Sequence, residues 1–445
     1  FFLKRLPRGG VGGSVPVFTR PAPGQSDFYM TDTVATSREP SRVEFIVLVA
    51  ALMALNALAI DVMLPALPYM GEALGIANEN ERQLVVGFYM FGFGIAQLAF
   101  GPLTDRFGRR GPLLVGLAIY LFCAFAATFA PNFGALLALR FVQGMGAAGT
   151  RVIATAVVRD RFEGREMAEV MSLTFMIFMA IPIIAPGIGQ VILLTGPWQY
   201  IFLFMGGLAS LIGLWGYFRL PETMHPEYRR ALSFKSVVEG FRIVVTNRPA
   251  LFYGLAGTFL FGAMFGFITA SQQIFVELYG LGPYFPVAFA VMAGTIAIAQ
   301  FINSRVVRRV GMRRLAHTAN LVYLAAAAIW LILALAGPVP FAVFFGLFMV
   351  IQFFFGWAAS NMNSLSMEPL GNVAGTAASV FGFTQTVGGA LIGTYIGQQY
   401  NGTLVPNAIG YASMGALVLI CVLIAENGRL FGVGVQYARG AGTGR

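Results

Sequence analysis

The sequence is poor in charged residues, cysteine and histidine, and each shortage excludes a class of protein. Only 11% of the 445 residues are charged and 57% are hydrophobic, whereas a soluble domain carries about 25% charged residues. The two cysteines, Cys123 and Cys421, both lie within apolar runs, which argues against a disulfide framework or a metal cluster. We therefore expect an integral membrane protein that binds neither a metal nor another cofactor.

The positive charge is distributed in a way that indicates membrane topology. The formal net charge is +10, and the 29 lysine and arginine residues fall in alternate loops and in the two tails, except for Arg82, Arg140 and Arg151. Positive charge concentrates in this way on the cytoplasmic side of membrane proteins. We therefore predict a protein that contacts a lipid bilayer and does not bind nucleic acid.

Twelve apolar runs of about 20 residues follow one another, the length that a hydrocarbon core of roughly 30 Å requires. The sequence therefore predicts an all-α integral membrane protein with twelve transmembrane helices. The predicted spans cover approximately residues 44–68, 83–103, 112–130, 134–158, 167–193, 198–218, 251–276, 285–307, 315–336, 340–360, 372–397 and 407–425.

The links between the runs predict the domain organisation. The longest link, 219–250, separates two predicted six-helix bundles at 44–218 and 251–425. Within this link, apolar residues recur at helical spacing from Phe234 to Val245, which predicts a short amphipathic helix on the inner leaflet or a stiff tether between the bundles.

Both termini are predicted to lie in the cytoplasm, in tails at 1–43 and 426–445. The links after the odd-numbered spans hold one basic residue, Arg82, whereas the other links hold the basic clusters. Residues 1–29 lack an initial methionine and are rich in glycine, proline and arginine. We expect them to be disordered or to be an artefact upstream of Met30.

Three charged residues lie well inside the predicted spans, away from their ends, where a charge costs about 2.5–3.5 kcal/mol on insertion scales. They are Asp61 in the first span and Arg140 and Arg151 in the fourth. Two other acids, Glu277 and Glu368, lie at predicted span edges, and we expect them to be solvated.

Asp61 and Arg140 lie at similar depths, within one helical turn. If their helices are neighbours, the two side chains could pair or approach through a water-filled cavity. Moving the arginine would change the proton affinity of the carboxylate, which suits a proton carrier; a permanent structural ion pair is the alternative. Arg151 follows Arg140 by eleven residues, close to three turns, so both project from one face. We expect all three to take part in proton coupling.

The link between the second and third spans reads Gly101-Pro-Leu-Thr-Asp-Arg-Phe-Gly-Arg-Arg110. It resembles the loop signature of the major facilitator superfamily. The resemblance implies two pseudo-symmetric six-helix bundles that expose a central site to each side in turn. It also implies that this loop is a conformational gate, whose members are Gly101, Asp105, Arg106, Gly108, Arg109 and Arg110.

The resemblance further implies that Asp105 caps the start of the eleventh span, near Gly371 and Asn372, in one state only. The signature recurs in the second half as Ser304-Arg-Val-Val-Arg-Arg-Val-Gly-Met-Arg-Arg314, where Gly311 matches Gly108 and Arg308 replaces the acid. This recurrence predicts an asymmetric internal duplication.

Two further stretches resemble signatures of proton-coupled drug transporters. Arg140-Phe-Val-Gln-Gly-Met-Gly-Ala147 resembles a span-four signature whose arginine is tied to proton transfer, which implicates Gln143 and Gly144. Pro182-Ile-Ile-Ala-Pro-Gly-Ile-Gly189 resembles the span-five signature of drug/proton antiporters, which implicates Pro182, Pro186, Gly187 and Gly189. In this second stretch Ala185 and Gln190 replace glycines, and helix packing alone is the alternative explanation.

The stretches Ala59–Pro68 and Met367–Ser379 look like those of the bicyclomycin/chloramphenicol-resistance (Bcr/CflA) branch of the drug/proton antiporters. This resemblance implies a monomeric bacterial inner-membrane transporter that exports small amphipathic organic compounds in exchange for protons. A proton symporter or uniporter for a small metabolite is the alternative. We do not expect an enzyme, because the spans hold no convergent nucleophiles or metal ligands.

Overall fold

The computed structural model describes residues 40–224, 227 and 234–431, and in this part of the chain every regular element is a helix. The predictions for residues 1–29 concern residues outside this part. Eleven of the described helices are long and apolar enough to cross a membrane, and α13 (Ala374–Gln398), at 25 residues, is as long as they are. These twelve helices confirm the all-α membrane fold predicted from the sequence.

The first six long helices form the N-terminal bundle, and short helices interrupt only its first connection. The chain leaves α1 through the 3₁₀ turn η1 (Leu64–Ala66) and the short helix α2 (Leu67–Ala73), and η2 (Glu79–Gln83) precedes α3. The long helices are α1 (Arg42–Asp61), α3 (Leu84–Phe107), α4 (Arg110–Ala127), α5 (Phe133–Arg161), α6 (Gly164–Thr195) and α7 (Gln199–Arg219).

The last six long helices form the C-terminal bundle, which is connected to the first bundle through the short helix α8 (Phe234–Thr246). The π-helical turn η4 (Gln273–Leu278) extends α9, and η5 (Gly282–Tyr284) and η6 (Glu368–Val373) precede α10 and α13. The other long helices are α9 (Arg248–Gln272), α10 (Phe285–Val310), α11 (Met312–Ala336), α12 (Phe341–Met367) and α14 (Val405–Ala425).

Local sequence signals explain where these helices begin and end. The side chains of Asn132 and Asn247 accept hydrogen bonds from backbone N–H groups in the first turns of α5 and α9, which satisfies donors that a helix leaves free. α3 and α10 end at Gly108 and Gly311, with φ of +87° and +89°. Residues other than glycine rarely adopt this backbone conformation. A glycine therefore ends the corresponding helix in each half.

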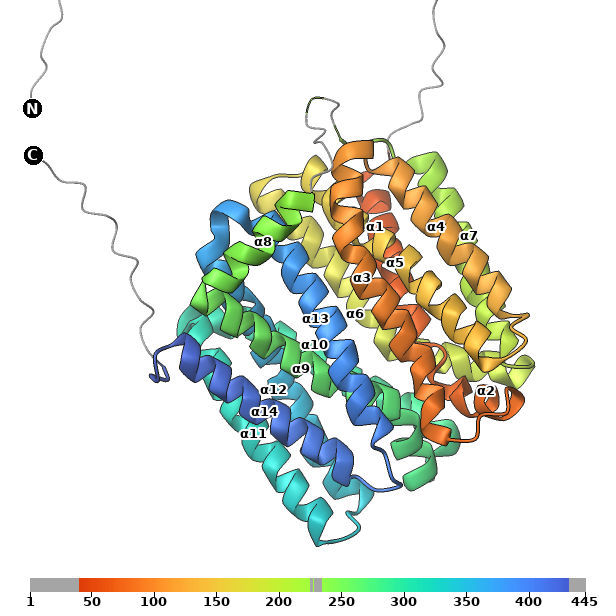
Figure 1. Ribbon diagram of the computed structural model, residues 1–445, viewed down its shortest axis with the longest axis vertical. Coiled ribbons are helices and arrows are strands. Elements are labelled where there is room, and N and C mark those ends of the chain that lie inside the picture. Colours follow the sequence, from red (N-terminus) through yellow and green to blue (C-terminus); the bar gives the residue numbers. More distant parts are fainter. Residues whose placement is uncertain (1–39, 225–226, 228–233, 432–445) are drawn as a thin grey trace, which may run out of the picture. The chain divides into compact units, whose positions relative to one another are not determined.

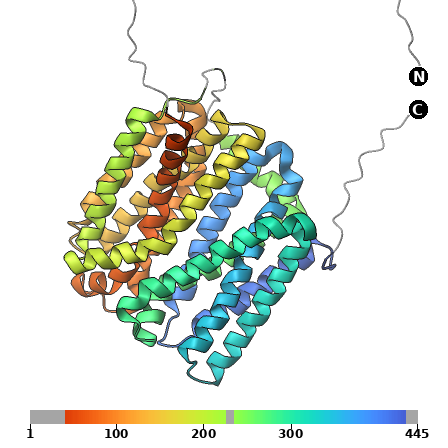
Figure 2. The ribbon, with the colours of Figure 1, turned by 180° about the vertical axis from the view of Figure 1, so that it is seen from behind.

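The two bundles lie side by side and meet along α3 with α13 and along α6 with α10 (Figures 1 and 2). We call the end of the bundles that carries Arg109, Arg110 and Arg313 the basic end, and the end that carries η2 and η4 the opposite end. α8 lies at the basic end against α9 and α13, where the rings of Phe241 and Phe383 are 5.9 Å apart. The candidate site residues lie inside the N-terminal bundle and at its two ends.

Candidate functional site

Asp61 is the last residue of α1, at a break in the first span. The turn η1 and α2 follow it, with Pro65 and Pro68 at their second positions, and proline cannot supply the N–H group that would continue the α1 ladder. The side chain of Asp61 is 5% exposed. Among the described residues, no cation lies within salt-bridge distance of its carboxylate and no hydrogen bond reaches it. The break therefore presents an unpaired carboxyl group inside the bundle.

Arg140 does not pair with Asp61, which corrects the expectation of a direct ion pair. Its fully buried guanidinium donates to the carbonyl oxygen of Ala59 at 2.9 Å, to that of Val85 at 3.2 Å, and to Gln143 Oε1 at 2.7 Å. Ala59 lies in the last turn of α1, where carbonyl groups lack helical partners and a positive charge is favourable. Arg140 thus holds α5 against the broken end of α1, two residues from Asp61.

Tyr89 and Asn56 complete this network, and a role for Tyr89 was not predicted from the sequence. The Arg140 guanidinium lies 4.3 Å from the centroid of the Tyr89 ring, an arrangement in which the ring face attracts the cation. The Tyr89 hydroxyl donates to Asn56 Oδ1 at 3.1 Å. Both side chains are buried, so the guanidinium is enclosed by acceptors and a ring in place of water.

Two motif glycines allow this close approach of helices. A Cβ atom at Gly144 would lie 2.0 Å from the carbonyl oxygen of Tyr89, and one at Gly189 would lie 1.9 Å from the carbonyl oxygen of Val62. Neither distance is possible for a real side chain, so α5 packs on α3, and α6 packs on the break after Asp61, only with glycine there. Nothing lies within 4 Å of a Cβ at Gly187. Pro182 and Pro186 both lie within the continuous helix α6.

Arg151 makes no hydrogen bond with Asp61 or Arg140 in the described part of the chain. Stacked rings lie between it and their network, since the ring centroids of Phe93 and Tyr89 are 6.5 Å apart. Arg151 lies eleven residues after Arg140 on α5, about 16 Å along the axis at 1.5 Å per residue. Its guanidinium lies 5.8 Å from the centroid of the Phe93 ring. Among the described residues, no side chain or carbonyl group accepts a hydrogen bond from it and no acid forms a salt bridge with it. The structure therefore does not bring the three intramembrane charges together.

The gate loop between α3 and α4 is held by charges at the basic end of the N-terminal bundle. The Arg109 side chain donates to Asp105 at 2.8 Å and to Asp160 at 2.7 Å. Burial would lower the pKa of Arg109, but its hydrogen bonds with Asp160 and Asp105 raise it above the usual value, so the guanidinium keeps its charge. Asp160, at the end of α5, was not predicted from the sequence.

The carboxylate of Asp105 is engaged by Arg109, four residues later in the same loop. The expected cap at the start of the eleventh span involves Asn372, whose side chain lies outside the described residues. Gly101 faces α13: a Cβ atom there would lie 3.9 Å from Ser379 Oγ. The motif therefore lies at the bundle interface, and its Asp105–Arg109 pair is formed within its own bundle.

Glu222, after α7, binds the other side of the gate loop. Its carboxylate accepts hydrogen bonds from the backbone N–H groups of Arg109 at 2.8 Å and Arg110 at 3.1 Å. The side chain of Arg110 donates to the carbonyl oxygen of Tyr217 at 2.6 Å, while Arg106 lies over the ring of Phe107. The matching loop of the C-terminal bundle uses Arg313, which forms salt bridges with Glu368 at 2.7 Å and Glu426 at 2.9 Å.

At the opposite end, polar side chains join the two bundles directly; we call this group the interbundle clasp (Asn80, Arg82, Gln83, Gln273, Glu277 and Gln398). Arg82 of η2 forms a salt bridge with Glu277 of η4, and Gln83 donates to Gln273. Asn80 donates to the carbonyl oxygens of Gln398 at 3.1 Å and Tyr400 at 2.7 Å, and the amide group of Gln398 donates back to the carbonyl oxygen of Asn80 at 2.6 Å.

Glu277 is exposed, as expected from the sequence, and its salt bridge with Arg82 is a contact that the sequence did not predict. The Arg82 side chain is 8% exposed and that of Glu277 is 32% exposed. Arg82 was also the one basic residue in the outer links of the sequence, where it looked like an exception to the charge pattern. It is buried at the bundle interface because Glu277, nearly 200 residues away, neutralises it there.

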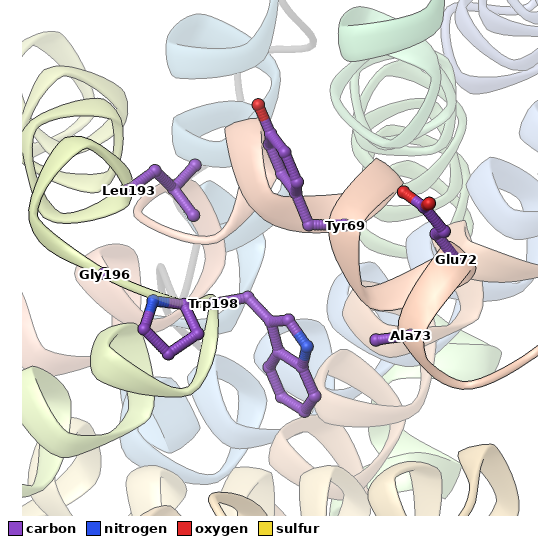
Figure 3. A pocket seen from close by; sticks show the side chains of 7 residues that line it. Tyr69, Glu72, Ala73, Leu193, Gly196 and Trp198 are labelled. Atoms are coloured by element: carbon purple, nitrogen blue, oxygen red, sulfur yellow. The ribbon is translucent and has the colours of Figure 1, made fainter.

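A shallow pocket of about 510 Å³ lies near the opposite end, within the N-terminal bundle. Figure 3 shows that Tyr69 and Glu72 line it from α2, whereas Leu193 lines it from the last turn of α6 and Trp198 from just before α7. None of its lining residues belongs to the Asp61 network or to the clasp. It is therefore separate from the candidate site.

In the part of the chain that the structure describes, no three His, Cys, Asp or Glu residues come together as a metal site. Cys123 and Cys421 are both buried and free. The ligands that the candidate site offers are hydrogen-bond donors, acceptors and aromatic rings, which bind organic compounds and protons.

Comparisons with known proteins agree with this architecture. Residues 49–393 match the family model of the Major Facilitator Superfamily. The chain is 29% identical over 391 residues to a bicyclomycin resistance protein homolog of Haemophilus influenzae, which covers 87% of this chain and 96% of that protein. It is 31% identical over 346 residues to the multidrug resistance protein MdtL of Klebsiella pneumoniae, covering 77% of this chain and 85% of that protein.

A solved structure of a D-xylose–proton symporter shares the fold, with a TM-score of 0.64, 14% identity and coverage of 86% of this chain and 97% of the symporter chain. At this identity the similarity concerns the fold alone.

Proposed function

The chain belongs to the major facilitator superfamily, and from this premise we propose that it is a proton-coupled antiporter. It exports small amphipathic organic compounds across the bacterial inner membrane and acts as a monomer. The relatives named for bicyclomycin and multidrug resistance support this function. The observation that carries the proton coupling is Asp61, a buried carboxyl group without a partner at the break of a membrane-spanning helix.

The basic end faces the cytoplasm, because loops rich in arginine remain on that side during insertion. Both termini are then cytoplasmic, and the interbundle clasp faces the periplasm. In the described residues, the clasp joins the bundles on the periplasmic side, whereas the ion pairs at the basic end lie within single bundles. The conformation thus favours entry of compounds from the cytoplasm.

The proton step uses Asp61, and Arg140 positions it. The proton affinity of a carboxyl group depends on nearby charge and on water. Arg140 fixes the distance between α5 and the end of α1 through the carbonyl of Ala59. When the bundles rock and α1 moves against α5, the charge and water around Asp61 change, and a proton can be exchanged with one side at a time.

The experiment uses inverted membrane vesicles that are acidified inside by respiration. Bicyclomycin added outside meets the cytoplasmic face, and we expect it to release protons from the lumen of vesicles that contain the wild type. Asp61→Asn should abolish this release while the protein remains in the membrane, and Asp61→Glu, which keeps a carboxyl group, should retain part of it. Release by Asp61→Asn at the wild-type rate would refute the role of Asp61.

The same vesicles distinguish the antiporter from the proton symporter or uniporter that the sequence left open. An antiporter makes the lumen less acidic when the compound enters. A symporter running in this direction would carry protons inward with the compound, and a uniporter would leave the lumen pH unchanged. The sign of the pH change therefore decides between them.

A further inference from the structure

Arg151 lies deep within a spanning helix, and among the described residues nothing accepts a hydrogen bond from its guanidinium group. Arg140 has three acceptors, and Arg82 and Arg109 are paired with carboxylates at the two ends of the bundle. The Arg151 guanidinium instead lies over the face of the Phe93 ring. A cation inside the membrane with no partner is costly, so an unpaired arginine that is retained there points to a ligand.

The position of Arg151 is inside the protein and deep in the membrane. It lies ten residues before Arg161, the end of α5, which corresponds to about 15 Å at 1.5 Å per residue. The ring of Phe93 is fully buried, so a guanidinium group on its face cannot point into lipid. Arg151 is nevertheless partly exposed, which leaves room for another molecule beside its guanidinium group.

The neighbours of Phe93 place Arg151 close to the interface between the bundles. One face of α3 packs on α5, since a Cβ atom at Gly92 would meet the carbonyl of Phe141. The adjoining face packs on α13, where Gln97, one turn after Phe93, donates to Thr386 at 3.2 Å. Arg151 therefore lies beside the seam along which the two bundles must separate.

The C-terminal bundle holds a second unsatisfied donor on α13. The amide nitrogen of Gln385, next to Thr386, is buried and has no acceptor among the described residues, and it lies toward α9, where a Cβ atom at Gly257 would be 2.7 Å from it. Among those residues, the spans of the C-terminal bundle contribute no acid at the depth of Arg151. The positive charge of Arg151 is therefore left without a fixed counter-ion among the described residues.

We propose that Arg151 binds an anionic group of the transported compound, such as a carboxylate or sulfonate, while an aromatic or apolar body packs on the rings beside it. This inference rests on the proposed transport function and adds that amphipathic organic anions are its preferred substrates. It also assigns Arg151 to substrate binding in place of proton coupling. A guanidinium group suits this role because it stays charged and donates to two oxygens at once.

Three probes with the same ring and different charge test the proposal: naphthalene-2-sulfonate, 2-naphthylmethanol and (2-naphthylmethyl)trimethylammonium. Their binding to the purified full-length protein in lipid nanodiscs is measured by equilibrium dialysis. The wild type should bind the sulfonate at least tenfold more tightly than the ammonium compound. Arg151→Gln should weaken sulfonate binding about tenfold or more and change binding of the alcohol less than twofold, whereas Arg151→Lys should retain part of the preference.

Arg159→Gln is the matched control, because Arg159 is an exposed arginine on the same helix, and it should leave all three affinities unchanged. Equal binding of the three probes by the wild type, or an equal loss of all three in Arg151→Gln, would overturn the proposal. Proton release from vesicles upon addition of 2-naphthylmethanol tests the antiport separately. If proton release is seen but the three probes bind equally, the anion site is refuted and the antiport stands. If the Arg151-dependent preference is seen without proton release, the antiport is refuted and the anion site stands.

Discussion

The two bundles share one fold but differ in what fills their interiors. Both halves stop a helix at a glycine of positive φ and then fasten the next loop with an arginine and acids at the basic end. The described spans of the N-terminal bundle enclose Asp61, Arg140 and Arg151, whereas those of the C-terminal bundle enclose a stack of rings, in which Trp330 contacts Phe344, Phe348 and Tyr411.

This difference shows that the duplicated helical fold is shared by both bundles, whereas the charged groups for proton chemistry are confined to one of them. The fold depends on glycine stops and on pairs at helix ends, which both halves have kept. Proton chemistry needs a buried charge, and a buried charge destabilises a membrane protein unless it is held by acceptors. The N-terminal bundle therefore holds the charged groups, which lower stability, while the C-terminal bundle contributes stabilising packing of rings.

The largest expected effect concerns the aromatic interior of the C-terminal bundle. Trp330 is 1% exposed, so Trp330→Ala should cost about 3–5 kcal/mol of stability, the range for removal of a buried large side chain. Thermal unfolding in nanodiscs, followed by the loss of monodisperse protein, measures this. Ile332→Ala on the exposed face of the same helix is the control and should change little. A drop of equal size in both variants would mean that the ring stack is not the stabilising core.

The next effect concerns the charged interior of the N-terminal bundle. Arg140→Ala removes the three hydrogen bonds that its guanidinium donates to α1, to α3 and within α5. We expect proton-linked transport to fall about 100-fold, with a change in its pH dependence, because the end of α1 beside Asp61 is released. Arg159→Ala on the same helix should leave both the rate and the pH profile as in the wild type. An unchanged pH profile in Arg140→Ala would separate Arg140 from Asp61.

A matched pair of glycines tests whether the two loops are equivalent. Gly108→Ala and Gly311→Ala both force a side chain into a backbone region reserved for glycine, at about 1–3 kcal/mol each. Only Gly108→Ala also meets a carboxylate, since its Cβ would lie 2.5 Å from Glu222. Gly108→Ala should therefore be the more destabilising, and the excess should vanish in a Glu222→Ala background. A persisting excess would show that the loops differ in some other contact.

The smallest expected effect concerns the clasp that joins the bundles. Arg82→Glu and Glu277→Arg each place like charges together, so each should open the periplasmic side. Opening is measured as maleimide labelling of Thr269→Cys, a position that is 4% exposed and lies next to Gly397. We expect labelling by an impermeant reagent to rise about tenfold, or 1.4 kcal/mol. The double exchange, Arg82→Glu with Glu277→Arg, should restore protection; continued labelling would show that the pair does not hold this end closed.

The sequence was sufficient for the helices because lipid acts on each span separately. Predicted spans such as 134–158 and 407–425 correspond to α5 (Phe133–Arg161) and α14 (Val405–Ala425), since twenty apolar residues enter the membrane whatever their neighbours are. The first span was less well predicted. The run 44–68 looked continuous, but the helix ends at Asp61, where the prolines and the packing of Gly189 interrupt it.

The family, the helical membrane fold and the identity of the three intramembrane charges were thus determined by the sequence alone, because partition into lipid and loop motifs are local properties. The partners of the charges were decided only by the tertiary structure. Arg140 binds a carbonyl of α1 in place of Asp61, Asp105 binds Arg109, and Arg82 is buried against Glu277. Each choice depends on which of several acceptors the packing of distant helices brings within 3 Å, and composition and spacing do not contain that information.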